Sequence, residues 1–434
     1  MRRLRRPYLC GSRISKLRGG LTMSCEHLYD IWLSLALAKG GASFRKLLSR
    51  YSSAKEIYLA DREALASVIS SRVRDFETLS NKSLAQAKIT LDFCLSRGVG
   101  LLSYFDEEYP RSLREIKNPP QLLYYRGKLP DFNSSIFVSI VGTRRLSNYG
   151  RSHTYKIARE LASAGATVVS GLAKGIDGVA LAAAASVGKP TVAIIGSGID
   201  VCYPKEHLTL AREIVKCGCV MTEYPPHTKP DRFNFPKRNR IISALSEAVL
   251  VMEGREESGS LITAEFAAEQ GKKIYAFPGN VGNDSSVATL QLIKGGARLF
   301  TDSLDVINDI PRLNPFDIDK NNYLSMNEVL TSLSVSCVTV DDAVFYRKSK
   351  AKSPVKEEIS EPACDVSPQK EEEIEKKLGK RLLGLYQKIL PDKPTPIENL
   401  IDDEYALREV MQGVLKLEIS GYVEMLPGDR VRKL

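Results

Sequence analysis

The residues best suited to chemistry gather in segment 232–240, which reads Arg-Phe-Asn-Phe-Pro-Lys-Arg-Asn-Arg. Four cations alternate with two aromatic rings within nine residues. Cations neutralise phosphates and rings stack on exposed bases, a combination typical of proteins that bind single strands with little sequence preference. The segment therefore predicts a nucleic-acid contact. The alternative is that Phe233 and Phe235 lie in the core and only the basic side chains face solvent.

A second candidate is segment 140–150, where an apolar run leads into Gly-Thr-Arg-Arg-Leu-Ser. Gly142 permits close approach of the backbone to a ligand. The hydroxyls of Thr143 and Ser147 can donate to a phosphate oxygen, and Arg144 can pair with it through two hydrogen bonds. The spacing is neither the dinucleotide motif G-x-G-x-x-G nor a P-loop. The alternative interpretation is a tight turn with an arginine on the surface.

Segment 170–177, Ser-Gly-Leu-Ala-Lys-Gly-Ile-Asp, also follows an apolar run. Gly171 and Gly175 allow backbone amides to point into one concavity, which favours anions. Asp177 is expected to cap the helix that follows rather than to act as a catalytic acid. Segment 196–200, Gly-Ser-Gly-Ile-Asp, could shape the same crevice.

A further anion cradle is predicted at segment 257–264, Glu-Ser-Gly-Ser-Leu-Ile-Thr-Ala. Its small hydroxyl residues stand at the expected start of a helix. The free amides of a helix N-terminus favour a negatively charged group.

Motifs for several other chemistries are absent from the sequence. There is no G-x-x-x-x-G-K-[ST], so a P-loop ATPase is disfavoured. The four histidines are scattered and no serine or cysteine nucleophile has a visible partner. Among the eight cysteines only Cys217 and Cys219 are close together, without the second pair that a zinc site needs. The sequence therefore predicts no catalytic residue, no metal and no cofactor.

The segments that carry these residues alternate with apolar runs and helical patterns. Strands are expected at 136–141, 167–169, 191–195, 248–252 and 273–277, and helices at 154–164, 178–186, 207–216 and 261–269. Near-continuous apolar runs are typical of parallel strands covered on both faces. This alternation predicts an α/β fold, an extended Rossmann-like, doubly wound and mostly parallel sheet. Ligands bind at the carboxyl ends of the strands in such folds, where the candidate segments lie.

Two accessory modules flank this region. Helical spacing from Cys25 to about Gly98 predicts an N-terminal helical module. Its turn at Gly40 and Gly41 either touches a phosphate backbone, as in a helix-hairpin-helix or SAM-like unit, or belongs to a packing or dimerisation module.

At the other end, segments 381–390, 397–401 and 405–417 are expected to be helices. The ending 421–432 has the strand, turn and strand pattern of a β-ribbon, so a winged helix is predicted. The expected domains are a basic extension at 1–22, the helical module at 23–100, the Rossmann-like domain at 101–312, an irregular segment and charged linker at 313–379, and the winged helix at 380–434.

The 434 residues carry a formal net charge of +10, which suits a polyanionic partner. Seven basic residues and no acid precede Met23. This segment is either a basic arm for nucleic acid or untranslated sequence ahead of a start at Met23, with an organelle presequence as a third alternative. No apolar stretch approaches the ~20 residues that span a bilayer, so membrane insertion is not expected. The cysteine pattern favours a reducing compartment, and the cytoplasm is the predicted location.

Taken in order, these motifs resemble the bacterial DprA (Smf) family of DNA-processing proteins. The matching segments are 140–144 with Ser147 and 149–150, 170–177, 198–200 with 203–204, 235–242, 258–264 and 277–279. The resemblance implies a non-catalytic protein that binds single-stranded DNA in an extended Rossmann domain. It also implies that the protein protects incoming strands, loads the recombinase RecA during natural transformation, and forms a homodimer.

The resemblance also implies roles for particular residues. Arg144, Lys237, Arg238 and Arg240 would hold the DNA backbone, and Gly142, Ser170, Gly171 and Ser260 would shape the pocket. The complete expected set is Gly142, Thr143, Arg144, Ser147, Ser170, Gly171, Lys174, Gly175, Phe235, Lys237, Arg238, Asn239, Arg240, Gly259, Ser260 and Thr263.

The chain departs from the family pattern at three positions. Leu181 stands where the family usually has histidine, Ala288 where it has glycine, and Leu290 where it has asparagine. A pocket contact near Ser286 is therefore in doubt, whereas the fold should survive because the apolar pattern is kept.

Two other functions compete with this prediction. One is a Rossmann-fold enzyme of the lysine-decarboxylase-like group that cleaves nucleoside monophosphates, because segment 258–265 distantly resembles its loop. The other is a transcription regulator that acts through the winged helix. Asp402, Asp403 and Glu404 precede the third expected helix, and negative charge there repels phosphate. The winged helix is therefore expected to contact protein rather than DNA.

Overall fold

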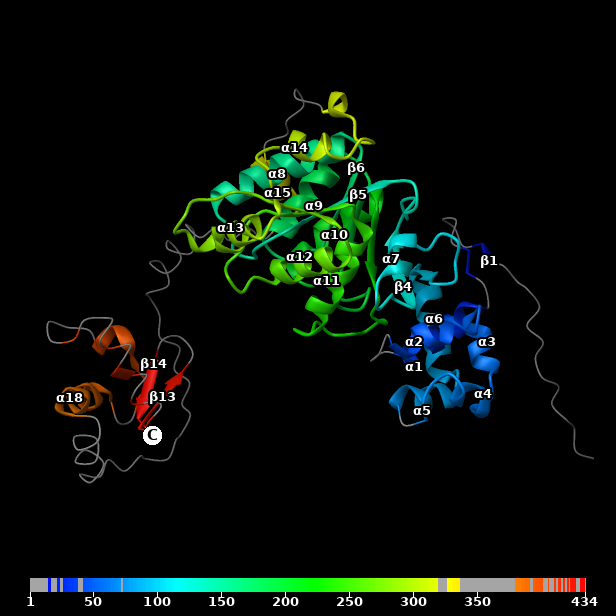
Figure 1. Ribbon diagram of the computed structural model, residues 1–434, viewed down its shortest axis with the longest axis horizontal. Coiled ribbons are helices and arrows are strands. Elements are labelled where there is room, and N and C mark those ends of the chain that lie inside the picture. The colour runs from blue at the N-terminus through cyan, green and yellow to red at the C-terminus, as the bar shows by residue number, and fades with distance from the viewer. Residues whose placement is uncertain are drawn as a thin grey trace, which may run out of the picture. The chain divides into compact units, whose positions relative to one another are not determined.

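The computed structural model of the chain is drawn in Figure 1. It describes residues 15–16, 22–23, 26–37, 42–71, 73–318 and 326–335, and near the C-terminus 379–390, 393–400, 405, 410, 413–414, 417, 420, 422–426 and 430–433. The chain forms two compact units, 1–351 and 352–434, and each is described by itself.

The first unit is built on one nine-stranded sheet with the order β11-β10-β9-β5-β6-β7-β8-β4-β3. Its strands are β3 (Gly100–Ser103), β4 (Leu122–Gly127), β5 (Ile136–Val141), β6 (Ala166–Ser170), β7 (Thr191–Ile194), β8 (Cys219–Thr222), β9 (Ala248–Val251), β10 (Lys273–Ala276) and β11 (Arg298–Leu299). Neighbouring strands are parallel except where β4 pairs with β3 and with β8. The predicted Rossmann-like α/β fold is confirmed.

The central strands are buried along their whole length because helices cover both faces of the sheet. Every residue of β5 is buried, including the polar Ser139. Its hydroxyl donates to the carbonyl oxygen of Ile242 at 2.9 Å and lies 2.6 Å from the hydroxyl of Ser246. These bonds satisfy a polar group that would otherwise be costly to bury.

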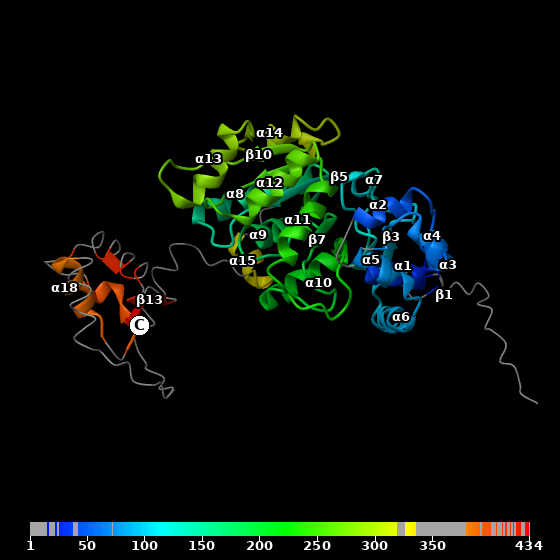
Figure 2. The same ribbon diagram turned by 60° about the horizontal axis from the view of Figure 1, so that its bottom comes forward.

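The helices divide between the two faces, and Figure 2 helps to locate them. The core on one face includes residues of α8 (Asn148–Ser163), α9 (Ile176–Ser186), α10 (Leu208–Cys217) and α14 (Ser303–Ile307). The core on the other face includes residues of α7 (Arg111–Glu115), α11 (Asn234–Leu245) and α12 (Gly259–Glu269). Helix α13 (Val287–Lys294) precedes β11.

The expected strand 136–141 matches β5 residue for residue, and the other expected strands and helices lie within a few residues of those observed. No helix was expected at the basic and aromatic segment 232–240, but most of it lies in helix α11. Pro236 does not prevent this because it lies in the first turn, where its missing N–H has no intrahelical acceptor to reach. Strands β3, β4 and β8 were not expected.

Among the described residues, six helices precede the sheet: α1 (His27–Ala36), α2 (Ala42–Leu48), α3 (Ala54–Leu59), α4 (Arg62–Ala66), α5 (Arg74–Ser80) and α6 (Ala85–Arg97). The hydroxyl of Ser103 in β3 donates to the buried carboxyl of Asp30 in α1 at 2.8 Å, which joins these helices to the sheet. Gly40 and Gly41 lie outside the described residues, and the kinship of the module stays a prediction. Residues 15–16 and 22–23, in and beside the expected basic extension, form the short antiparallel strands β1 and β2.

Part of the segment expected to be irregular, 313–379, is helical. Helix α15 (Met326–Ser332) buries Val329 and Leu330 in the same core as α9. The rest of the expected linker, 336–378, lies outside the described residues. Among the helices that the structure describes, none is both long and apolar enough to cross a membrane.

The second unit contains α18 (Lys380–Lys388), a 3-10 turn at Ile397–Leu400, and a three-stranded sheet of order β12-β14-β13. Strands β13 (Val423–Leu426) and β14 (Arg430–Lys433) are antiparallel, as the β-ribbon pattern predicted. Strand β12 (Thr395–Pro396) pairs with β14. Most of the third expected helix, 405–417, and residues 402–404 lie outside the described residues, so the winged helix stays a prediction.

Candidate nucleic-acid interface

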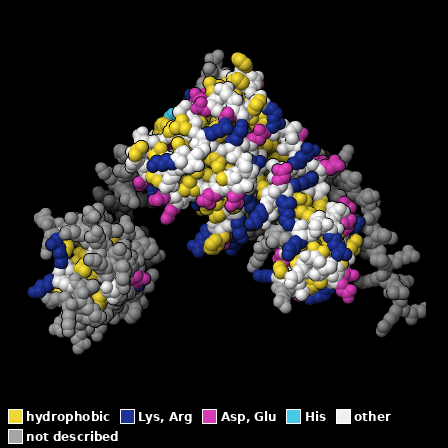
Figure 3. Space-filling view, in the orientation of Figure 1, with side chains coloured by type: hydrophobic (Ala, Val, Ile, Leu, Met, Phe, Trp, Pro, Cys, Tyr) yellow, Lys and Arg dark blue, Asp and Glu magenta, His cyan; other side chains and the backbone are white. Residues whose placement is uncertain are grey.

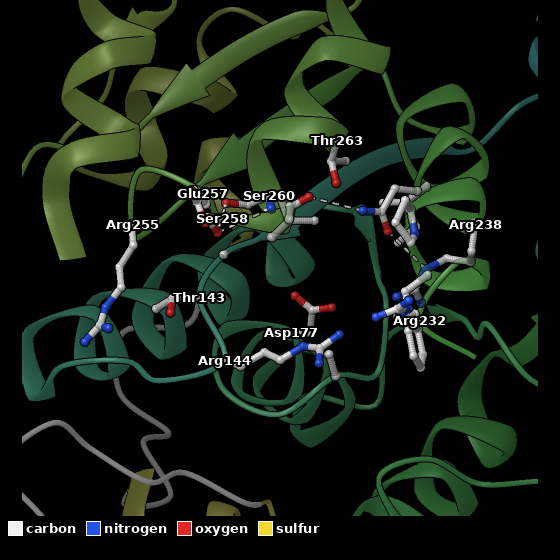
Figure 4. A pocket seen from close by; sticks show the side chains of 18 of the residues that line it. Thr143, Arg144, Asp177, Arg232, Arg238, Arg255, Glu257, Ser258, Ser260 and Thr263 are labelled. Carbon is white, nitrogen blue, oxygen red and sulfur yellow. Dashed lines mark hydrogen bonds between the residues drawn. The ribbon is translucent and has the colours of Figure 1, made fainter. Parts of the chain in front are cut away.

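A crevice lies where the direction of chain winding reverses in the sheet. Strand β5 pairs in parallel with β6 on one side and with β9 on the other. The connections that leave β5 and β9 therefore move apart and open a space at their carboxyl ends, the usual ligand site of such folds. The cavity there has a volume of about 620 Å³. We call it the switch-point crevice, and its most polar lining residues are shown in Figure 4.

Nine expected site residues line the switch-point crevice: Gly142, Thr143, Arg144, Phe235, Arg238, Asn239, Gly259, Ser260 and Thr263. Gly171 and Lys174 line a small adjoining cavity of about 50 Å³ that also touches Arg144 and Phe235. Ser147, Ser170, Gly175, Lys237 and Arg240 line neither cavity. The lining also contains residues outside the expected set, notably Asp177, Arg232, Arg255, Glu257 and Ser258.

The loop after β5 is held from two sides. The N–H of Thr143 donates to the carbonyl oxygen of Glu253 at 2.8 Å, and the N–H of Ile176 donates to the carbonyl oxygen of Thr143 at 3.2 Å. A Cβ atom on Gly142 would lie 2.6 Å from Cγ1 of Ile176. Glycine is therefore required by packing within the protein, and the loop is fixed before any ligand arrives.

Ser147 has a structural role instead of the expected phosphate contact. Its hydroxyl and its N–H both donate to the buried carboxylate of Glu253, at 2.5 and 2.9 Å. The hydroxyl oxygen also accepts the N–H of Gly150, which caps α8. A Cβ on Gly150 would lie 2.2 Å from the Glu253 carboxylate, so glycine makes room for this carboxylate.

Arg238 was expected to face the DNA backbone, but only 4% of it is exposed. Its guanidinium donates to the carbonyl oxygens of Gly171 and Ile194. Burial lowers the pKa of Arg238 to about 10, which keeps the group cationic at neutral pH. Arg238 therefore forms the floor of the switch-point crevice and joins α11 to the ends of β6 and β7.

Asp177 lies close to Arg238 and is also buried. Burial raises the pKa of its carboxyl, while the positive charge of Arg238 acts in the opposite direction. The expectation that Asp177 caps a helix was wrong, since Gly175 is the cap residue of α9. Asp177 instead accepts the N–H of Gly171 at 3.1 Å and so shapes the loop after β6.

The exposed cations of the crevice are Arg144, Arg232 and Arg255. The guanidinium carbon of Arg144 lies 5.3 Å from the ring centre of Phe235, which is only partly buried. Phe233 is 63% exposed, with Arg232 against its ring. The alternative that both phenylalanines belong to the core is therefore wrong. Aromatic faces and cations stand together at the mouth of the crevice.

Two of the expected DNA-binding cations lie elsewhere. Arg240 forms an ion pair with Glu223 at 2.5 Å, and its side chain is only 16% exposed. Lys237, although exposed, does not line the crevice. Because successive residues of a helix point in different directions, the compact basic motif of the sequence is spread around α11.

Besides the loop after β5 and helix α11, the start of α12 lines the crevice. The sequence predicted a helix start at this segment. Ser258 caps the helix by accepting the N–H of Ser260, and their hydroxyls lie 2.8 Å apart. The side-chain amide of Asn239 donates to the carbonyl oxygen of Gly259 at 3.2 Å, which joins α11 to this wall. Helix N-termini with neighbouring hydroxyls favour anions.

The charge of the lining also favours an anionic ligand. Four arginines stand against two carboxylates, those of Asp177 and Glu257. Figure 3 shows Lys and Arg side chains gathered along the lower edge of the first unit, with some acidic side chains among them. Within the described part of the chain, no group of three or more His, Cys, Asp or Glu side chains could hold a metal ion. Fold and lining together define a doubly wound α/β protein with a crevice whose charge suits an anion.

Comparison with known proteins narrows this class to one family. The family model of DNA recombination-mediator protein A matches residues 100–311. The chain is 42% identical over 205 residues to the DNA processing protein DprA of Streptococcus pneumoniae, covering 47% of this chain and 72% of the relative. It is 33% identical over 336 residues to the Smf protein of Synechocystis, and this match covers 76% of this chain and 78% of the relative. The chain belongs to the DprA/Smf family, and the resemblance drawn from its motifs is confirmed.

A solved structure agrees with this assignment. The match to the X-ray structure of DprA from Streptococcus pneumoniae covers 65% of this chain and 97% of the solved chain. Its TM-score is 0.58 and the sequence identity is 33%. The family model is described as a DNA recombination-mediator protein, and the relative from Streptococcus pneumoniae is named a DNA processing protein.

The departures from the family pattern are accommodated by packing. Leu181 and Ala288 are fully buried. A Cβ on Gly254 would lie 2.9 Å from the methyl carbon of Ala288, so these two positions are in close contact. Neither Leu181, Ala288 nor Leu290 lines the switch-point crevice.

Proposed function

We propose that this protein binds single-stranded DNA in the switch-point crevice without catalysing a reaction. The observation that carries the proposal is the pairing of Arg144 with Phe235 at the mouth of the crevice. A cation beside an exposed ring can hold a phosphate while a base stacks on the ring. A duplex keeps its bases stacked inside, so this arrangement favours single strands.

The binding surface proposed here differs from the basic cluster of the sequence motif. Arg144, Arg232 and Arg255 supply exposed charge, and Phe235 supplies the ring. The hydroxyls of Ser258 and Ser260 add hydrogen bonds at the start of α12. Arg238 does not contact the strand in this proposal. It holds the chain at Gly171 and Ile194 and so fixes the floor of the crevice.

The biological role proposed here follows the family. The bound strand would be protected and then passed to RecA, which fits the family's description as a recombination mediator. Such a role belongs in the bacterial cytoplasm. We also propose that the protein works as a homodimer and that its C-terminal module contacts other proteins.

The competing enzyme hypothesis is less well supported. The glutamate that matches the nucleotide-cleaving loop is Glu265, which is exposed on α12 and does not line the switch-point crevice. Asp177 is engaged with a backbone amide of its own unit. Glu265 is therefore not placed to act on a nucleotide held among the arginines. Asp177 lines the crevice, but its carboxylate already serves the loop after β6 as a hydrogen-bond acceptor.

A binding experiment with the full chain tests the proposal. A labelled single strand of about 30 nucleotides is compared with the matching duplex over a salt series. The variant is Arg144→Ala/Arg255→Ala, and the matched control is Arg74→Ala/Arg111→Ala, which removes two exposed arginines that do not line the crevice. We expect the single strand to be preferred, and the crevice variant to lose affinity and salt slope while the control keeps both.

Two outcomes would contradict the proposal. One is equal affinity for single strand and duplex with no effect of the crevice variant. The other is release of base from a nucleoside monophosphate by the wild-type protein and not by the crevice variant, which would favour the enzyme.

A further inference from the structure

A second cavity, of about 570 Å³, lies on a different part of the first unit. It is bordered by α6, β4 and α10, which can be located in Figure 1. None of its lining residues belongs to the switch-point crevice. Its size falls within the range of roughly 300–1,000 Å³ that is common for ligand sites.

The floor of this cavity is aliphatic. Ile195, Ile199 and Val220 are buried there, and Ala211 and Val215 are partly buried on α10. At the rim, Leu208 is 45% exposed although it is a large apolar residue. The floor therefore suits apolar side chains more than a fully hydrated ligand.

Three arginines from three elements surround this floor: Arg97 of α6, Arg126 of β4 and Arg212 of α10. Within the described residues, none of them makes a side-chain hydrogen bond or an ion pair. The Nε atom of Arg126 is buried without an acceptor. A buried donor without a partner is costly, and no acceptor of the protein offsets this cost at Arg126.

The single carboxylate of the lining does not neutralise these arginines. Asp200 accepts the N–H of His227 at 2.8 Å, and its other oxygen lies 2.7 Å from Nδ1 of the same histidine. The ring of His227 in turn packs edge-on against Phe93, with ring centres 4.7 Å apart. The cavity thus keeps a positive rim over an apolar floor.

We propose that this cavity binds an acidic peptide segment of a partner protein. Its carboxylates would pair with Arg97, Arg126 and Arg212, and its apolar side chains would enter the aliphatic floor. Arginine clusters recognise acidic motifs in this way because each guanidinium can bind a carboxylate through two hydrogen bonds. Nucleic acid fits less well, since Phe93 is the only aromatic carbon ring in the lining and it already packs against His227.

Fluorescence anisotropy with the full chain tests this proposal. The probe is a fluorescein-labelled octapeptide that alternates aspartate with leucine and phenylalanine, and its counterpart carries lysine in place of aspartate. The variant is Arg97→Glu/Arg212→Glu. The matched control, Lys88→Glu/Lys189→Glu, reverses two exposed charges, one of them on the same helix α6.

We expect the acidic peptide to bind and the lysine peptide not to bind. The arginine variant should lose at least about tenfold in affinity, since two charge-assisted contacts become repulsive, and the lysine control should not change. An Ala211→Phe variant should also weaken binding because it fills the floor while every arginine remains. Both cavity variants should keep the single-strand affinity of the wild-type protein, which shows that they fold.

The proposal fails if the acidic peptide does not bind, or if it binds the arginine variant as tightly as the wild type. It also fails if the arginine variant loses affinity for the single strand instead of the peptide, which would assign this surface to nucleic acid. Displacement of the peptide by dodecanoate but not by unlabelled peptide would assign the cavity to a small amphipathic anion. Because the two cavities share no residues, this result and the DNA-binding result are independent.

Discussion

The guanidinium of Arg238 donates to the carbonyl oxygen of Gly171 at 2.7 Å, across 67 positions of sequence. This bond joins helix α11 to the loop after β6 beneath the switch-point crevice. A Cβ on Gly171 would lie within 2.4 Å of the same guanidinium, so the contact requires both residue types. A cation that the sequence motif predicted to contact DNA is thus part of the framework that shapes the crevice.

We expect Arg238→Ala to destabilise the protein by about 3–5 kcal/mol, because it leaves the carbonyl oxygens of Gly171 and Ile194 without a donor and removes a positive charge that favours the buried carboxylate of Asp177. Arg238→Lys should cost less, since the charge remains although fewer carbonyl oxygens are reached. Urea denaturation measures both effects. Lys237→Ala, at an exposed neighbouring position, is the control and should change stability by less than about 0.5 kcal/mol. Unchanged stability in Arg238→Ala would contradict the framework role.

Replacement of Glu253 by glutamine should loosen the loop that carries Arg144. The carboxylate accepts two hydrogen bonds from Ser147, and a glutamine amide would turn an NH₂ group toward one of these donors. The expected loss is about 1–3 kcal/mol of stability, measured by urea denaturation. Glu265→Gln, the same change at an exposed position on α12, is the control. Equal midpoints for the two variants would show that the Glu253 contacts carry no net energy.

Phe235→Leu should separate stacking from charge in DNA binding. Loss of one base stack costs about 1–3 kcal/mol, while the salt slope should stay the same because no cation is removed. Arg144→Ala, by contrast, should lower both affinity and slope. Salt titrations with a labelled single strand distinguish the two effects. A reduced slope in Phe235→Leu would mean that the ring acts mainly by positioning arginines.

A buried carboxyl in α1 predicts a pH dependence of stability. Burial raises the pKa of Asp30 to about 6, while the hydrogen bond from Ser103 acts in the opposite direction. The folded state therefore binds this proton more tightly than the unfolded chain, whose aspartate titrates near 3.9. The contribution of Asp30 to stability is greatest below about pH 4 and is lost as the pH rises through 6.

Asp30→Asn removes this titration and still offers an oxygen to Ser103. We expect the unfolding free energy of the variant, relative to wild type, to improve by about 2 kcal/mol between pH 4 and pH 7. Denaturation series at several pH values measure this difference. Asp92→Asn, at an exposed position on α6, should show no such trend. A flat difference for Asp30→Asn would mean that its carboxyl titrates normally.

Much of the sheet could be predicted because each strand is marked by the apolar residues of its own segment. Segment 136–141 is apolar except for Ser139, and a run of this kind fits only a strand covered on both faces. The glycine-containing loops could also be located from the sequence, because they directly follow these apolar runs. A side chain at Gly142 would collide with Ile176, although the sequence alone suggested a ligand as the reason for this glycine. A side chain at Gly150 would collide with Glu253.

The site residues were harder to predict because their roles depend on distant partners. Nothing near Arg238 in the sequence shows that its guanidinium donates to two carbonyl oxygens at the ends of other strands and lies close to Asp177. Arg240 likewise meets Glu223 of a preceding loop. Arg255 was missed, although its position just after the apolar run 248–252 placed it at a strand end. The location of the site could be predicted from the strand ends. Which cations reach it depends on tertiary contacts that the sequence does not show.

The pairing of β5 with β9 also affects how the protein is made. Val138 is a register partner of Ala248, so the middle of the sheet stays incomplete while about 110 further residues are synthesised. At roughly 5–20 residues per second, this takes on the order of 5–20 seconds. During that interval the nascent chain exposes an unpaired strand edge, which invites aggregation. A translation product that stops before residue 251 therefore lacks the α12 wall of the switch-point crevice and keeps an incompletely paired strand edge, which makes it a substrate for chaperones or proteases.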